Sequence, residues 1–152
     1  MSAKPHVRFQ RPNYVVTDLD RALTVYRDIL GLEIAFTKNS EKTSYSYEVF
    51  QIDPAADMRF AVLSTQTQTN VMALTELKGI ELPEVPLPSR SAIVLECEDF
   101  DGVMNNARAA GLKVFDESRL ETKDGRIGRE LGFLDYDGNL IVIYIILENS
   151  DA

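Results

Sequence analysis

The chain has 152 residues, of which 45% are hydrophobic and 26% are charged, as is typical of one globular domain with a sizeable core. Its net charge of −8 disfavours nucleic acids and anionic membranes as partners, because both require a basic surface. The single cysteine, Cys97, excludes an intramolecular disulfide. No stretch of the sequence has the pattern of a signal peptide or of a membrane span. We therefore expect a soluble, cytoplasmic, acidic protein.

The first predicted module extends over residues 7–65. Val7–Val16 predicts a strand that Pro12 interrupts, because proline lacks the N–H that a strand ladder requires. The Thr-Asp pair at 17–18 can cap a helix whose apolar residues recur at helical spacing up to Gly31. Three strands are predicted next, the middle one from the partial alternation in SYSYEVFQI, at residues 32–37, 44–52 and 58–64.

Residues 66–90 form a predicted linker that begins with polar residues and ends with three prolines. Between them, VMALTEL (71–77) suits either a short helix or a strand. A loop of this length is more often functional than inert, so we expect it to cover the ligand site or an oligomer interface. The second predicted module, residues 91–148, repeats the order of elements. A strand at 91–97 precedes a helix that Asp99 caps and Gly111 ends, and three strands follow at 112–115, 126–135 and 139–147.

The two modules contain related motifs. Asp18-Leu19-Asp20 aligns with Asp99-Phe100-Asp101 at an offset of 81 residues, and Gly31-Leu32 aligns with Gly111-Leu112 at an offset of 80. An internal repeat of this length predicts two copies of one structural unit that share a core. The expected fold is therefore α+β, with two strand–helix–three-strand modules in a single domain over residues 1–152.

Three stretches of the chain resemble the vicinal oxygen chelate superfamily, which includes glyoxalases, bleomycin resistance proteins and extradiol dioxygenases. They are NYVVTDLDRALTVYRDILGLEI (13–34), AIVLECEDFDGVMNNARAAGLKV (92–114) and GFLDYDGNLIVIYI (132–145). The resemblance implies two βαβββ modules that form a curled mixed sheet around a pocket. It also implies a homodimer as a common assembly, with each barrel built within one chain or by modules exchanged between two chains.

The resemblance also marks the positions at which metal-using members carry His, Glu or Gln ligands. Counted from the matched motifs, these positions hold Arg11, Ala61, Ala92 and Val142. A guanidinium is always cationic and the other three side chains have no donor atom, so none of them can hold a divalent ion. His6 is the only histidine and precedes the first strand, which makes it a poor ligand candidate. We therefore predict neither a metal site nor a cofactor.

Strand alternation predicts which side chains line the pocket. The lining is largely apolar with a few polar groups, as is usual for a site that binds a small organic molecule, and an inward arginine favours an anion. The pattern leaves open that Arg11 faces solvent beside Pro12. It also leaves open that the two tyrosines of an expected aromatic wall pack elsewhere. The predicted ligand-binding residues are Arg11, Asn13, Arg59, Tyr45, Tyr47, Val142 and Tyr144.

Glu96 is the best candidate for a catalytic residue. It shares a predicted strand face with Ala92 and Val94, and a carboxylate in an apolar cup can act as a general base. Cys97 would point away from that cup, and residues 125–130 lack the spacing of a phosphate-binding loop.

Three functions stay open. The residues favour a metal-independent protein that binds a small, partly apolar organic ligand, which an inward arginine would favour as an anion. The first alternative is a metal-independent lyase or isomerase that uses Glu96 as its base. The second is a metal-dependent lyase or dioxygenase whose ligands the motifs do not reveal.

Overall fold

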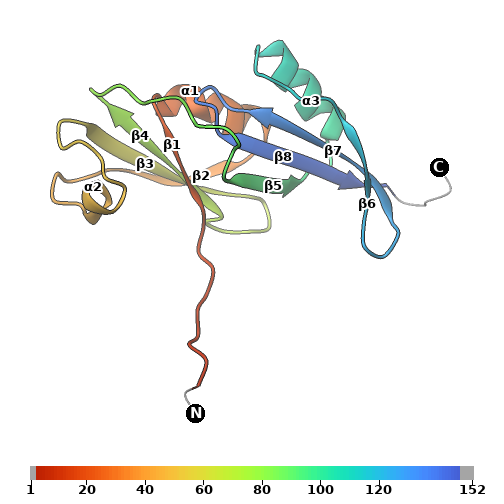
Figure 1. The fold of residues 1–152 in the computed structure, drawn as a ribbon, viewed down its shortest axis with the longest axis horizontal. Helices are drawn as coiled ribbons and strands as arrows, with labels where there is room; N and C mark the ends of the chain where they lie inside the picture. Colours follow the sequence, from red (N-terminus) through yellow and green to blue (C-terminus); the bar gives the residue numbers. More distant parts are fainter. Residues whose placement is uncertain (1–2, 148–152) are drawn as a thin grey trace.

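The computed structural model describes residues 3–147 and contains two four-stranded sheets that lie side by side (Figure 1). The first sheet has the strand order β1-β4-β3-β2 and the second has the order β5-β8-β7-β6. In each sheet the first and last strands of the module pair in parallel, and the other pairs are antiparallel. The predicted α+β fold with two βαβββ modules is confirmed. The two sheets do not close into a barrel.

The elements of the first module are β1 (Asn13–Val16), α1 (Leu19–Leu23), its π-helical continuation η1 (Thr24–Ile29), β2 (Glu33–Asn39), α2 (Tyr45–Val49), β3 (Asp57–Ser64) and β4 (Met72–Lys78). Those of the second module are β5 (Ala92–Glu96), α3 (Phe100–Ala109), β6 (Ser118–Glu121), β7 (Ile127–Leu134) and β8 (Leu140–Ile146). Residue 148, the last residue of the predicted second module, lies outside the described residues. None of the helices between residues 3 and 147 is long and apolar enough to cross a membrane.

The repeated motifs fix the ends of the helices. The side chains of Asp18 and Asp99 accept a hydrogen bond from the backbone N–H three residues later, at 3.0 and 3.1 Å. Each therefore acts as an N-cap. Gly31 and Gly111 follow the helices with φ of +80° and +79°, a conformation that suits glycine because it has no Cβ.

The second aspartate of each motif pairs with an arginine on the third strand of its module. Asp20 lies 3.5 Å from the guanidinium of Arg59 on β3, and Asp101 lies 2.8 Å from that of Arg129 on β7. The repeated Asp-x-Asp therefore ties the start of each helix to the sheet beneath it. The motif has a structural role in both modules.

The predicted strand at residues 44–52 is wrong, because this segment contains the one-turn helix α2. Ser44 begins it by accepting a hydrogen bond from the N–H of Ser46 at 3.3 Å. Only Tyr47 within α2 is buried, and a single buried side chain fits a short helix as well as a half-buried strand.

The predicted linker at 66–90 contains a strand. β4 is buried from Met72 to Leu77 because both faces of this central strand are covered, so its sequence shows no alternation. In the second module, the predicted strand at 112–115 contributes only the isolated bridge between Val114 and Phe133. The outer strand of that sheet is β6.

One hydrophobic core lies between the helices and the sheets and extends through both modules. α3 contacts both η1 and β8, so the two helical layers meet on the same side of the molecule (Figure 1). The largest fully buried side chains of this core include Tyr26, Leu63 and Leu74 from the first module and Leu131, Phe133 and Ile141 from the second. The two modules therefore form one domain.

The turn between β7 and β8 connects the second module to the first. Asp135 at its start is buried and accepts a hydrogen bond from the Tyr26 hydroxyl at 2.8 Å. Asn139 donates from Nδ2 to the carbonyl of Val15 at 3.0 Å. Burial raises the pKa of Asp135, although hydrogen bonds from Asn139 and Tyr26 oppose the rise. This turn fixes the second sheet against β1.

Candidate functional site

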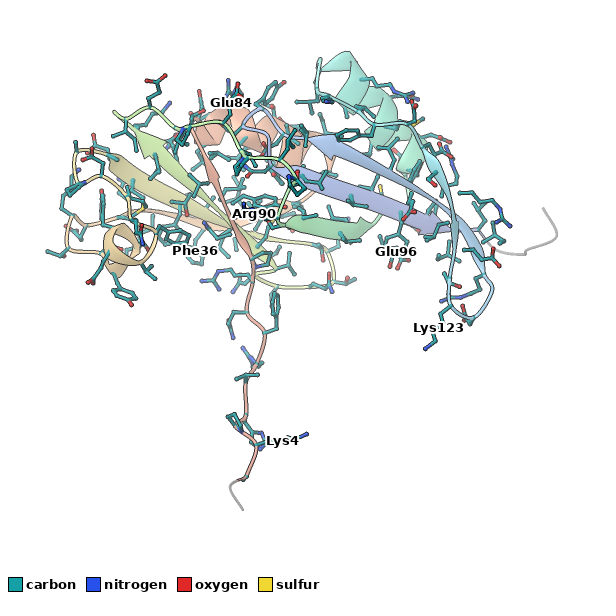
Figure 2. The ribbon with its side chains drawn as sticks, in the orientation of Figure 1. Lys4, Phe36, Glu84, Arg90, Glu96 and Lys123 are labelled. Atoms are coloured by element: carbon teal, nitrogen blue, oxygen red, sulfur yellow. The ribbon has the colours of Figure 1, made fainter. Side chains whose placement is uncertain are left out.

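A cavity of about 450 Å³ lies on the concave face of the second sheet, which points away from α3. The alternate residues on these strands point the other way: Ile141 and Ile143 are fully buried in the core. Figure 2 shows Glu96 projecting from the side opposite to α3. Apolar side chains of β5, β6 and β8 line much of the cavity, namely Val94, Leu120, Val142 and Ile146. We call this concave face the second cup.

A row of polar side chains crosses the second cup. The strand register places Tyr144 of β8 between Glu96 of β5 and Glu130 of β7. The Tyr144 hydroxyl donates to Glu96 Oε2 at 3.3 Å. All three side chains line the cavity, so two carboxylates flank a phenol beside the apolar side chains of Val94, Val142 and Ile146, which we call the apolar floor.

Among residues 3–147, Arg126 is the only cationic side chain that lines the cavity, and its guanidinium is paired with Asp124 at 3.1 Å. The cavity therefore offers mainly hydrogen-bond acceptors and negative charge. Such a lining complements a ligand group that donates hydrogen bonds or carries a positive charge.

The second cup is open to solvent. Glu96 is exposed, and Val94 beside it is 61% exposed although it is apolar. A general base was expected to be a carboxylate enclosed by apolar side chains. One chain alone does not enclose Glu96 in this way. An open apolar surface of this kind is typical of a ligand or partner site.

The structure brings together three of the predicted site residues: Glu96, Val142 and Tyr144. Asn13 lies on the equivalent face of the first sheet, where its Oδ1 accepts a hydrogen bond from the Thr75 hydroxyl at 2.7 Å. Its Nδ2 is buried and has no hydrogen-bond partner among residues 3–147.

Arg59 does not reach the second cup, because it lies on the helix-facing side of the first sheet. Its guanidinium donates two hydrogen bonds to the buried carboxylate of Glu76, at 2.8 and 3.1 Å. That carboxylate also accepts from the N–H of Leu19 at 2.6 Å. Burial alone would raise the pKa of Glu76, but the hydrogen bonds from Arg59 and Leu19 outweigh it and lower the pKa. A smaller cavity of about 260 Å³ lies beside this pair.

The other predicted ligand-binding residues are also outside the second cup. Arg11 is exposed and precedes β1. Tyr45 on α2 is 70% exposed, whereas Tyr47 is buried and donates to the carbonyl of Ala56 at 2.7 Å. The two tyrosines do not form an aromatic wall, because they lie on a helix rather than on a strand.

The concave face of the first sheet is partly covered. Tyr47, Ile52 and Ala56, which lie in α2 and the segment after it, pack against Met58 and Leu77 and form a second hydrophobic cluster. This cluster covers the part of the concave face that lies over β4 and the start of β3. Some cavity-lining residues were not predicted from the sequence. They lie on β7, on β8, and on or beside β6, for which the sequence predicted a strand at the wrong residues: Leu120, Thr122, Arg126, Glu130 and Ile146.

The strand pairing of the first sheet replaces one of the four positions that correspond to the family's metal ligands. The last strand of the first module is β4, and Ala61 on β3 is buried on the helix-facing side. Asn13 pairs with Ala73 as Val94 pairs with Val142, so Ala73 is the position equivalent to Val142. Alanine has no donor atom either.

The remaining two positions, Arg11 and Ala92, also lack a suitable donor. Among residues 3–147, no three His, Cys, Asp or Glu side chains are grouped as a metal site would require. The donor set in the structure therefore does not fit the divalent ion that the family resemblance implies.

Comparison with solved structures shows the fold. The chain is similar to a glyoxalase family protein from Bacillus cereus, with 16% identity and a TM-score of 0.73 over 97% of this chain and 99% of that chain. It is also similar to the trypanothione-dependent glyoxalase I of Leishmania major, with 17% identity and a TM-score of 0.63 over 91% and 86%. The fosfomycin resistance protein FosX of Listeria monocytogenes, in complex with Mn(II) and sulfate, gives 15% identity and a TM-score of 0.55 over 93% of each chain.

A search of curated proteins finds no match. The sequence profile of the Glyoxalase/Bleomycin resistance protein/Dioxygenase superfamily, in contrast, matches residues 6–143 and so covers both modules. Together with the two βαβββ modules and the repeated Asp-x-Asp motifs, this match identifies the chain as a member of the Glyoxalase/Bleomycin resistance protein/Dioxygenase superfamily.

Proposed function

We propose that the second cup binds a small, partly apolar organic molecule and that it does so without a metal ion. The observation that carries this proposal is the row Glu96–Tyr144–Glu130, which lies over an apolar floor in a cavity of about 450 Å³. Small-molecule sites combine an apolar lining with a few oriented polar groups in this way.

The lining further supports a ligand with a positively charged or hydrogen-bond-donating group. An anion was expected from Arg11 and Arg59, but neither lines this cavity. A carboxylate or phosphate placed beside Glu96 and Glu130 would be repelled, whereas an ammonium group would gain charge-assisted hydrogen bonds. We therefore propose an aromatic or aliphatic amine as the ligand class.

Matched probes test this proposal. Calorimetric titration with tryptamine and with indole-3-acetate compares a cation and an anion on the same ring system. We expect tryptamine to bind at least tenfold more tightly and chemical shifts to change at Val94, Val142 and Tyr144. Equal or tighter binding of indole-3-acetate would contradict the proposed ligand charge. No binding by a wider panel of apolar amines would contradict the proposed site.

A lyase or isomerase reaction without a metal is the second candidate. Here the supporting observation is the hydrogen bond from Tyr144 to Glu96, which places a proton donor beside a carboxylate base. For any substrate that the protein converts, Glu96→Gln should lower turnover far more than it weakens substrate binding. Unchanged turnover in this variant would remove Glu96 as the base.

Metal analysis separates both candidates from a metal-dependent enzyme. We expect the purified protein to contain well below one equivalent of nickel, zinc, iron and manganese by plasma mass spectrometry. Any of these metals at one equivalent per chain would contradict the metal-independent proposal.

We also propose that the protein is a homodimer in the cytoplasm. The open second cup supports the dimer, since a second chain could enclose it, and the single cysteine agrees with a reducing compartment.

A further inference from the structure

The segment formed by residues 3–12, here called the arm, runs away from the rest of the molecule (Figure 1). Its last anchor is the hydrogen bond from the N–H of Ala73 to the carbonyl of Pro12, at 3.0 Å. Beyond that point Val7 and Phe9 are 91% and 83% exposed. Two large apolar side chains held in water are stabilised when a partner covers them. The arm is therefore a candidate contact element.

The arm is basic, and its large apolar residues occupy alternate positions. Val7 and Phe9 are two residues apart, so they share one face of an extended segment. None of the 24 acidic residues of the chain precedes Asp18, although Lys4, Arg8 and Arg11 do. A positively charged arm on a chain with a net charge of −8 is attracted to other parts of the same protein.

The second cup complements the arm in both respects. Its floor exposes apolar side chains, with Val94 61% exposed, and Glu96 and Glu130 provide two carboxylates. Another long exposed surface, β2, also exposes apolar side chains, but it carries Glu33 and Lys38 and so has no clear charge preference for a basic segment. Charge therefore favours the second cup as the docking surface.

A second copy of the chain is the occupant that this geometry favours. Figure 2 shows Lys4 far from the body, while Glu96 lies on the second sheet. The arm leaves β1 in a direction that carries it away from its own second sheet, so the cup of another copy is the accessible one.

We propose that the arm of one copy docks across the open second cup of a second copy. Val7 and Phe9 then face the apolar floor, and the positive charge of the arm is attracted to Glu96 and Glu130. The docked arm therefore covers the surface that the function proposed above gives to the ligand, and a ligand must displace it. This competition rests on that proposed function, whereas the docking itself does not.

Disulfide trapping between two different chains tests the docking directly. In a Cys97→Ser background, a chain with Phe9→Cys is mixed with a chain with Val94→Cys, so that the new disulfide must join two chains. Leu87→Cys, in place of Phe9→Cys, is the matched control because Leu87 is 85% exposed and lies outside the arm. We expect at least tenfold more mixed disulfide with Phe9→Cys than with the control.

Equal trapping by the two variants would overturn the proposal. So would preferential trapping of Phe9→Cys by a Phe36→Cys chain, since this would place the arm at β2. With both cysteines on one chain, a disulfide that forms within monomers would place the arm in its own cup and would also overturn it.

Sedimentation equilibrium provides an independent measurement on the full chain. We expect the wild type to dimerise and Phe9→Asp to raise the dimer dissociation constant at least tenfold, with less than a twofold change for Leu87→Asp. A monomeric wild type, or equal effects of the two variants, would contradict arm docking. Neither experiment uses a ligand, so both outcomes are independent of the tryptamine titration that tests the proposed function.

Discussion

The two modules share their framework but differ on their concave faces. In the second sheet, the row across the central strands is Glu96–Tyr144–Glu130, and it lies in an open cavity. The first sheet is covered at the corresponding place by α2 and the segment that follows it. There the equivalent row is apolar or uncharged: Val15, Thr75 and Phe60.

This difference shows which residues of the repeat are structural and which are free to change function. The residues that recur in both modules cap the helices, end them and tie them to the sheets. The side chains in the central row on the concave side differ between the modules. One module therefore provides a covered, structural half and the other provides the candidate site.

The largest expected effect concerns the arginine that each module places on its third strand. Arg59→Met should lower the free energy of unfolding by about 3 kcal/mol, because it leaves the buried carboxylate of Glu76 without its cation. The equivalent Arg129→Met should cost about 1 kcal/mol or less, since its partners Asp101 and Glu117 are much more exposed. Urea unfolding of both variants measures the comparison, and equal losses would contradict it.

The same pair predicts a pH dependence. The pKa of Glu76 in the folded protein lies below its usual value of 4.5, so its stabilising contribution is present above about pH 4.5. It is lost as the pH falls through the lowered folded-state pKa. The difference in unfolding free energy between the wild type and Arg59→Met should therefore shrink in acid. A difference that stays constant down to pH 3 would exclude this charge pair as its source.

The contribution of Asp135 to the free energy of unfolding should change with pH in the opposite direction. Asp135→Asn should cost about 2 kcal/mol, because an amide nitrogen cannot accept the hydrogen bonds that Tyr26 and Asn139 donate at 2.8 and 2.9 Å. Burial raises the pKa of Asp135, so its contribution is complete below its usual value of 3.8 and declines as the pH rises through the folded-state value. The wild type should lose part of its advantage over Asp135→Asn between pH 3 and pH 7. A growing advantage would contradict the raised pKa.

The difference between the two concave faces can be tested by filling each with an indole. Val142→Trp should weaken tryptamine binding at least tenfold, about 1.4 kcal/mol, because Val142 lines the open cavity. Phe36→Trp on the first sheet is the control, since Phe36 is exposed and lies outside that cavity. It should leave the affinity within twofold, and an equal loss in both variants would place the binding site elsewhere.

The sequence predicted most of the fold because the framework carries short-range signals. Asp18 and Asp99 as caps, and Gly31 and Gly111 as helix ends, act within a few residues of their own position. β4 was left open between a short helix and a strand, because a strand that is buried on both faces has no period in its sequence. The short helix α2 was missed because one turn buries too few side chains to define a period.

The candidate site was predicted only in part, because it depends on which strands pair. Glu96, Val142 and Tyr144 follow from alternation on β5 and β8, whose positions were correct. Arg59 was assigned to the wrong side because β3 was taken as the last strand of its module, and its partner Glu76 lies on β4, which was left open between a helix and a strand. Glu130 enters the cup only through the register of β7 with β8, which no local pattern encodes.

The smallest expected effect tests whether α2 closes the first concave face through Tyr47. Tyr47→Phe removes the hydrogen bond to the carbonyl of Ala56, but Lys42 also donates to that oxygen at 2.6 Å, so the oxygen keeps a partner. The expected cost in unfolding free energy is therefore only about 0.5–1 kcal/mol. The exposed Tyr45→Phe should change it by less than about 0.3 kcal/mol. If urea unfolding gave both variants the same free energy, the hydroxyl of Tyr47 would not anchor α2, and apolar packing alone would hold the cover over the first sheet.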